Sequence, residues 1–319
     1  MDVSVHPEDE PQPVMVRLLS GLLRAAGDPD WRGIAKYAHG VRVGVGVKLP
    51  RTPAVYPKKV RWALPTQKNA ELLDDPPLDV PILLENYLSA KELAKEVEED
   101  LEDLLSRGLC VKLSVSEARE KFGSQFVVAS LGALVKKVDE EGNRVIRLLF
   151  DGTREVPLNR SIKVRDQEIP PGAPDLKLTL REQAKYRTVP FGLVADVKDA
   201  HRAVVIRRED RHLLGCRARK DGPIYFMSRG TFGIASASYW WGRIAAGFLR
   251  LCYYFVAHAV PFWGMVLADD FKFETAAAEF VEWLLAIILL GGNLRDPLVV
   301  GQASRRHGVR LGWLSTSST

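Results

Sequence analysis

An acidic pair interrupts two apolar runs in the last quarter of the chain. Asp269 and Asp270 follow Gly264–Ala268 and precede Phe271–Phe273, which predicts a two-stranded hairpin with both acids at its turn. Like charges beside a hydrophobic sheet repel each other and resist the loss of water. A bound divalent cation would relieve this repulsion, although Asp-Asp at a hairpin tip is also common as a solvated turn.

A further carboxylate follows an apolar run upstream. The run 189–195 predicts a short strand that ends at Asp196, and Asp199 comes three residues later. Two strands that bring acids to one sheet edge can hold two Mg²⁺ ions about 4 Å apart, as nucleotidyl transfer requires. The alternative is that Asp196 caps the next turn and Asp199 is a surface residue.

A glycine-containing loop lies between the two acidic sites, and together they carry a resemblance. The segments are Asp196 with Ala200-His201, then Phe232-Gly233 with Ala237, then Asp269-Asp270. In this order they resemble the first three palm motifs of reverse transcriptases. The sequence is most similar to the polymerases of retrotransposons. Upstream, residues 133–139 and 147–151, separated by 140–143, resemble the fingers hairpin of that family. The resemblance covers about residues 88–292.

The resemblance implies an α+β fold, with an antiparallel polymerase palm sheet backed by helices and a fingers subdomain. We expect a proline-rich N-terminal arm over 1–87, fingers over 88–187 and palm over 188–319. Eleven of the 19 prolines precede residue 85, which excludes long helices and central strands from much of the arm. The palm's C-terminal end looks incomplete, and the thumb is expected to be missing or truncated.

The resemblance also implies an activity, RNA-directed DNA polymerisation by two-metal transfer of deoxynucleotides to a primer. Asp196, Asp269 and Asp270 would be the catalytic and metal-binding residues, and the cofactor would be two Mg²⁺ ions, with Mn²⁺ as a substitute. Partners would be an RNA or DNA template with its primer, and deoxynucleoside triphosphates. Nucleotide binding is expected at six residues: Lys136, Lys137, Arg147, His201, Phe232 and Gly233.

The nucleotide-binding residues have chemical reasons. Phe232 and Gly233 would line the base and sugar pocket, and Gly233 would let the backbone approach the nucleotide closely. Strand alternation would turn Arg147 toward the cleft and Ile146, Leu148 and Phe150 away from it. An arginine fork and a lysine charge suit phosphate oxygens. His201 stands where the family has a bulky aromatic residue that blocks a ribose 2′-hydroxyl.

An alternative function is a catalytically inactive or truncated retroelement remnant that keeps the fold and at most binds nucleic acid. A different palm enzyme, such as a nucleotide cyclase, also uses carboxylates and two metals, but the glycine loop and the fingers hairpin argue against it. Leu267 and Ser238 depart from the family pattern, which usually has tyrosine and proline there. The native template, the source element and the oligomeric state stay open.

Composition agrees with these expectations. The chain has 319 residues, 46% hydrophobic, and a net charge of +5, which mildly favours a polyanionic partner. The three cysteines lack metal or disulfide spacing, and the acidic N-terminus lacks a signal peptide pattern. An intracellular location, cytoplasmic or nuclear, is therefore expected. The apolar stretch 245–268 is long enough for a membrane, but we expect Gly247 and Pro261 to divide it into a helix end and a strand.

Local patterns predict four further elements. Apolar spacing predicts a helix over 14–26, and alternation with glycine predicts a strand over 41–47. A capping box at Ser89 and Glu92 and an apolar stripe predict a helix that ends at Gly108. A shorter helix is expected over 116–122, before Gly123.

Overall fold

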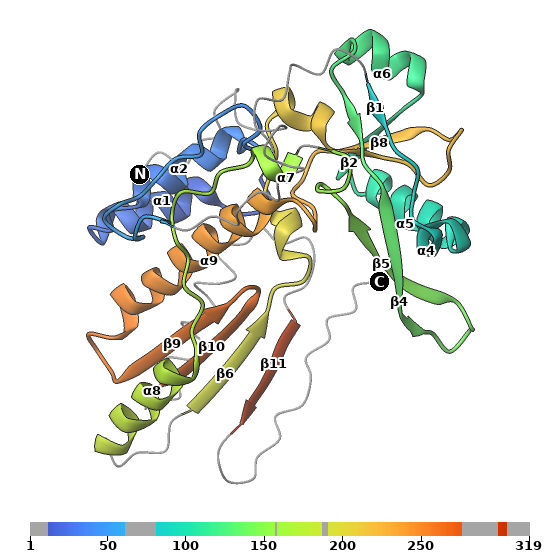
Figure 1. Cartoon of the computed structure of the whole chain (residues 1–319). Helices are drawn as coiled ribbons and strands as arrows, with labels where there is room; N and C mark the ends of the chain where they lie inside the picture. Colours follow the sequence, from blue (N-terminus) through green and yellow to red (C-terminus); the bar gives the residue numbers. More distant parts are fainter. Residues whose placement is uncertain (1–11, 61–80, 157, 187–190, 276–298, 305–319) are drawn as a thin grey trace.

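The computed structural model describes residues 12–60, 81–156, 158–186, 191–275 and 299–304. It is a mixed α+β structure with two separate sheets and a β-hairpin, and helices pack against them (Figure 1). One sheet is mixed and the other is antiparallel.

The antiparallel sheet contains the strand that ends at Asp196 and the strand that begins at Asp270. Its order is β11 (Val299–Ser304), β6 (Phe191–Asp196), β10 (Asp270–Thr275) and β9 (Phe262–Leu267). One face is apolar because alternate residues point to the same side: Phe271 and Phe273 of β10 and Leu193 and Ala195 of β6 are buried. The long helix α9 (Ala235–Val256) packs beside β9 (Figure 1).

The five-stranded mixed sheet has the order β1, β3, β7, β8, β2. The strands are β1 (Ile82–Leu83), β2 (Cys110–Leu113), β3 (Val127–Val128), β7 (Gly215–Cys216) and β8 (Ile224–Met227). Helix α5 (Ala94–Ser106) packs against β2 through its buried stripe Val97, Leu101 and Leu104, as predicted. Helix α6 (Val115–Phe122) also forms as expected, with Ser114 and Glu117 as its capping box.

The predicted hairpin is present and forms a two-stranded sheet of its own. Strands β4 (Leu131–Val138) and β5 (Arg144–Phe150) pair in antiparallel register around the turn at 139–143. Ile146 and Phe150 are buried and Arg147 is exposed, so the predicted alternation along β5 is confirmed. Beyond the hairpin lie the helices α7 (Leu158–Ser161) and α8 (Ala173–Lys185), and Gln183 of α8 contacts Glu274 of β10.

The described part of the arm belongs to the main hydrophobic core. Helix α1 (Val16–Ala25) confirms the helix predicted there, and α2 (Trp31–Ala35) and η1 (Lys36–His39) follow it. Leu23 and Ile34 are completely buried. They lie close to Gly247 of α9, where an added Cβ would stand 3.6 Å from Leu23 and 3.7 Å from Ile34.

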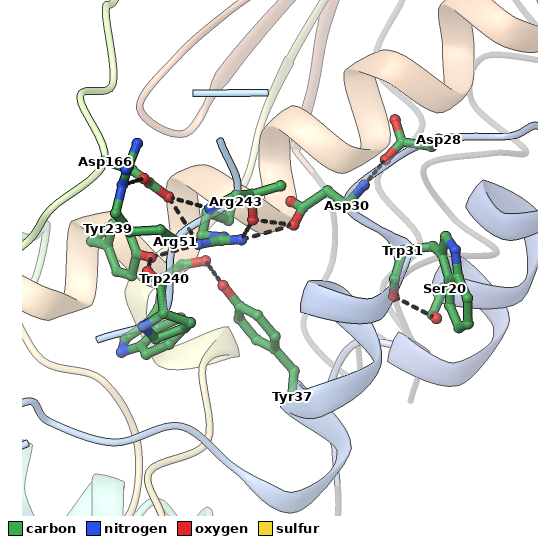
Figure 2. A network of polar contacts seen from close by, with 12 residues as sticks. Ser20, Asp28, Asp30, Trp31, Tyr37, Arg51, Asp166, Tyr239, Trp240 and Arg243 are labelled. Atoms are coloured by element: carbon green, nitrogen blue, oxygen red, sulfur yellow. Dashed lines mark hydrogen bonds and ion pairs between the residues drawn. The ribbon is translucent and has the colours of Figure 1, made fainter. Parts of the chain in front are cut away.

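A buried polar network holds the arm to α9 (Figure 2). Arg243 of α9 is 1% exposed, and its guanidinium lies 2.7 Å from Asp30 of the arm and 3.4 Å from Asp166. Arg51 of the arm also pairs with Asp166, at 2.7 Å. About two turns further along α9, Arg250 pairs with Asp28 at 2.6 Å. Each buried charge therefore has an opposite charge beside it, as burial demands.

Three local predictions are wrong. Residues 41–47 do not form a strand: Val41 makes a single bridge to Ile206, and the chain turns at Gly44 and Gly46, both with positive φ. Ser89 is not a helix cap, because its hydroxyl accepts the Ala133 N–H and Tyr87 caps α4 (Leu88–Glu92). Leu93 separates α4 from α5, so the predicted single helix is two.

The apolar stretch 245–268 is divided at only one of the two expected positions. Helix α9 continues through Gly247 to Val256, because the glycine packs closely against the arm, and β9 starts after Pro261. Within the described ranges, no helix is long and apolar enough to cross a membrane. Strand β11 forms where no strand was expected. The strand expected near Gly312 lies outside the described residues.

Candidate active site

The three predicted aspartates come together at one end of the antiparallel sheet. Asp196 is the last residue of β6, Asp270 is the first residue of β10, and the register places them directly opposite each other. Directly opposed residues of antiparallel strands project from the same face. Asp269 lies in the turn just before β10, and its carbonyl accepts the Val197 N–H at 3.1 Å.

The pKa of Asp196 reflects its closeness to the other two aspartates. The pKa of Asp196 is raised, first by partial burial and then by the negative charges of Asp269 and Asp270. Both Asp196 and Asp270 are exposed, so a ligand in solution can reach them. The repulsion is what a cation would relieve.

The turn that carries Asp269 is held by groups that the sequence pattern did not reveal. Ala268 has a φ of 57°, a left-handed conformation that costs a non-glycine residue about 1 kcal/mol. Trp241 of α9 donates its indole N–H to the Ala268 carbonyl at 2.9 Å. Trp241 is buried, as expected for core packing, and this hydrogen bond also ties the turn to α9.

Carboxylate oxygens, which the three aspartates supply, are the ligands that Mg²⁺ prefers, so the donor chemistry suits the predicted metal. In the part of the chain that the structure describes, however, no three His, Cys, Asp or Glu side chains are gathered closely enough to hold an ion. The aspartates are adjacent without converging on one point. Their metal-binding role stays a prediction.

Three of the predicted nucleotide-binding residues are in contact. The His201 and Phe232 rings meet edge to face with 4.6 Å between centroids, and the Arg147 guanidinium lies 5.9 Å from the centre of the Phe232 ring. They come from η2 (Ala200–Ala203), the glycine loop and β5. Burial lowers the pKa of His201 and the charge of Asp269 opposes this shift, which places the imidazole within electrostatic reach of the acids.

Gly233 lies against the end of the β4–β5 hairpin. It has a φ of 93°, and a side chain there would overlap the Phe150 carbonyl oxygen at the end of β5. The close approach is therefore between the glycine loop and the hairpin. It brings Phe232 beneath Arg147.

Asn159 of α7 fixes this loop, and sequence reasoning missed it. Its side-chain amide donates to the Gly233 carbonyl at 2.7 Å and its oxygen accepts the Ala235 N–H at 2.8 Å. The second bond satisfies a free N–H in the first turn of α9. The Asn159 amide also donates to the Thr153 hydroxyl at 2.9 Å. No sequence pattern linked Asn159 to a loop 74 residues away.

The two predicted phosphate lysines differ in position. Strand β4 has a bulge between Val135 and Lys137, so Lys136 has no partner in β5 and Lys137 lies opposite Val145. Val145 and Arg147 share a face because they are two residues apart, and Lys137 lies on that face too. Burial raises the pKa of Asp100 on α5, and the charge of Lys136 is one of those that oppose this shift, so Lys136 lies within electrostatic reach of α5.

Comparisons with known proteins give only a distant likeness. No protein-family model matches the chain, and no curated protein matches it. Among solved structures, the chain is similar to native prototype foamy virus protease–reverse transcriptase, with a TM-score of 0.46 and 15% identity over 72% of this chain and 26% of that one. The selenomethionine-labelled CSH mutant of that protein gives 0.46 and 16% over 71% and 25%. The chain thus spans about a quarter of their length.

Proposed function

We propose that the chain is an RNA-directed DNA polymerase domain of the reverse transcriptase type, which adds deoxynucleotides to a primer. One observation carries the proposal: the β6–β10 register sets Asp196 opposite Asp270, with Asp269 in the adjoining turn. Nucleotidyl transfer needs carboxylates from two strands at one exposed position. Palm and fingers would then be the antiparallel sheet with α9 and the region around β4–β5.

The aspartates would hold two Mg²⁺ ions, or Mn²⁺, with Asp196 and Asp269 as the principal ligands and Asp270 in support. When bound, such ions activate the primer 3′-oxygen and stabilise the leaving pyrophosphate. The chain's own contribution is position: Trp241 and Val197 fix the turn that carries Asp269 from two sides. Positioning and fixed charge supply most of the catalysis in this class of reaction.

The nucleotide would lie between the hairpin and the acids. Arg147 and Lys137 would hold its phosphates, and His201 and Phe232 would pack against its sugar and base. Because His201 and Phe232 already contact each other, a ribose 2′-hydroxyl would have little space there. A His201→Ala variant should therefore incorporate ribonucleotides more readily, measured as the ratio of ribo- to deoxynucleotide incorporation.

The second candidate is a non-catalytic remnant that keeps this fold and at most binds nucleic acid. It is favoured by the absence, within the described residues, of any convergent three-acid group. Binding alone would be salt-dependent, because phosphate contacts release counterions.

Primer extension on RNA and DNA templates separates the two candidates. The wild-type chain should incorporate deoxynucleotides with Mg²⁺, and Asp269→Asn should abolish incorporation while the circular dichroism spectrum is unchanged. Asp103→Asn, the same change on the exposed face of α5, is the matched control and should keep activity. Incorporation by Asp269→Asn would refute the metal assignment. A wild-type chain that binds primer–template but never extends it would favour the remnant.

A further inference from the structure

A small pocket beside the five-stranded sheet has four cations among its eight lining residues. It has a volume of about 270 Å³ and lies between the start of α4–α5 and the connection that joins β7 to β8. Its charged lining consists of Lys91, Arg217, Arg219 and Lys220, with Glu85 as the one carboxylate. A pocket of this size is small for a drug-like molecule and suits an ionic group.

The floor of the pocket is fixed by hydrogen bonds. Arg217 is 6% exposed, and its guanidinium donates to the Lys220 carbonyl and, at 3.3 Å, to the Leu84 carbonyl. Asn86 donates to the carbonyls of Arg217 and Ala218 at 2.8 and 3.0 Å. The Asn86 side-chain oxygen also accepts the Leu131 N–H at 2.9 Å. The segment of Leu84 and Asn86, the β7–β8 connection and the start of β4 are thus held together around the buried charge of Arg217.

Glu85 occupies the position of an anion in this pocket. Its carboxylate lies 2.7 Å from the Lys91 ammonium and 2.9 Å from the Lys220 ammonium. The hydrogen bonds from Lys91 and Lys220 lower the pKa of Glu85 to about 2, so it is ionised at neutral pH. Arg219 is paired outside the lining with Glu98, at 3.1 Å. The Glu85 carboxylate therefore lies between two lysine ammonium groups, in a pocket that the Arg217 guanidinium also lines.

We propose that this pocket binds a phosphate group, which takes the place of the Glu85 carboxylate between Lys91 and Lys220. A phosphate carries more charge and more acceptor oxygens than a carboxylate, and the Glu85 side chain can turn into solvent because it is exposed. The phosphate could belong to a nucleic-acid strand or be free in solution. The site uses none of the aspartates of the antiparallel sheet, so it does not depend on the proposed polymerase activity.

The test measures binding of inorganic phosphate by calorimetry and of fluorescein-labelled oligo-deoxythymidine by anisotropy, both in EDTA. Glu85→Gln removes the internal competitor and should tighten phosphate binding by about fivefold, whereas Lys220→Ala should weaken it by about fivefold. Lys95→Ala is the matched control, since Lys95 is exposed on α5 and lies outside the pocket lining. It should change the affinity by less than about twofold.

The two ligands identify the source of the phosphate. If both respond to Glu85→Gln and Lys220→Ala, the pocket binds the nucleic-acid backbone, and Lys220→Ala should also reduce the salt dependence of oligonucleotide binding. If only inorganic phosphate responds, the ligand is free phosphate. If Glu85→Gln and Lys220→Ala behave like Lys95→Ala with both ligands, the proposal is wrong, whatever primer extension shows.

Discussion

The bulge at Lys136 decides which lysine of β4 can act with Arg147. Without it, Lys136 would lie opposite Val145 and share the face of Arg147, but the bulge gives that place to Lys137. We expect Lys137→Ala to weaken deoxynucleotide binding by about tenfold, the loss of one charge-assisted phosphate contact, and Lys136→Ala to have little effect. Titration with a fluorescent deoxynucleoside triphosphate and Mg²⁺ measures both. A larger loss for Lys136→Ala would contradict the face assignment.

Repulsion at Asp196 should be visible in stability. Because the folded-state pKa of Asp196 is raised, ionisation costs the folded state stability as pH rises above the unfolded value, and the cost is absent below it. In metal-free buffer at pH 7, Asp196→Asn should therefore be more stable than wild type, by less than about 1 kcal/mol because the group is exposed. The gain should vanish as pH falls toward about 4.

Thermal melts from pH 4 to pH 8 test this sign. Asp221→Asn, the same change in the connection between β7 and β8, is the control and should show no such gain. If Asp196→Asn melts lower than wild type at pH 7, partial burial and the neighbouring charges do not make ionised Asp196 destabilising.

At the residue scale, the sequence predicted the residues that stand at a defined position in a motif. The three aspartates and the Phe232, His201 and Arg147 cluster were found because each stands in a recognisable order. Asn159 and Trp241 could not be found in this way, since each acts by a hydrogen bond to a carbonyl of a distant segment. Such bonds depend on tertiary approach, which leaves no periodic pattern.

At the scale of elements, the buried ion pairs tie α9 to the N-terminal arm and to Asp166. Arg243→Met would leave Asp30 and Asp166 buried beside an apolar side chain, and removing one partner of a buried pair costs about 3–5 kcal/mol. We expect that loss in the free energy of unfolding, measured with urea. Arg219→Met, which breaks the exposed pair with Glu98, is the control and should cost less than about 1 kcal/mol.

A double-mutant cycle makes the interpretation specific. Asp30→Asn should cost less in the Arg243→Met background than in wild type, because the Asp30 charge has then lost its nearest counter-ion and keeps only Arg250, at 3.6 Å. Additive losses would show that Arg243 stabilises the helix by packing alone.

Elements with strong local patterns were predictable and those set by contacts were not. The stripe of α5, the cap of α6 and the β4–β5 hairpin follow from spacing and turn residues. The strand expected at 41–47 failed because Gly44 and Gly46 adopt positive φ, which alternation cannot show. The break at Leu93 arises where Ser89 bonds β4 instead of capping the helix.

At the scale of the whole molecule, the described arm residues 12–60 are not an appendage. Val14, Leu19, Leu23, Ile34 and Tyr37 belong to the same core cluster as the α9 residues. Composition predicted an arm from its prolines, and it could not predict this burial, because the partner surface on α9 lies some 200 residues away. The Tyr37 hydroxyl, for example, donates to the Trp240 carbonyl.

Removal of residues 1–60 should therefore unfold the remaining chain. Burial of each large apolar side chain contributes about 1.5–3 kcal/mol, so the loss of several is comparable to a typical total stability of about 5–15 kcal/mol. Arg243 and Arg250 would also lose Asp30 and Asp28. We expect the shortened chain to lack near-ultraviolet circular dichroism and a cooperative melt, and the full chain to show one transition. Addition of a peptide of residues 12–60 should restore part of the signal. A shortened chain that melts cooperatively near the wild-type temperature would show that the arm is a separate unit.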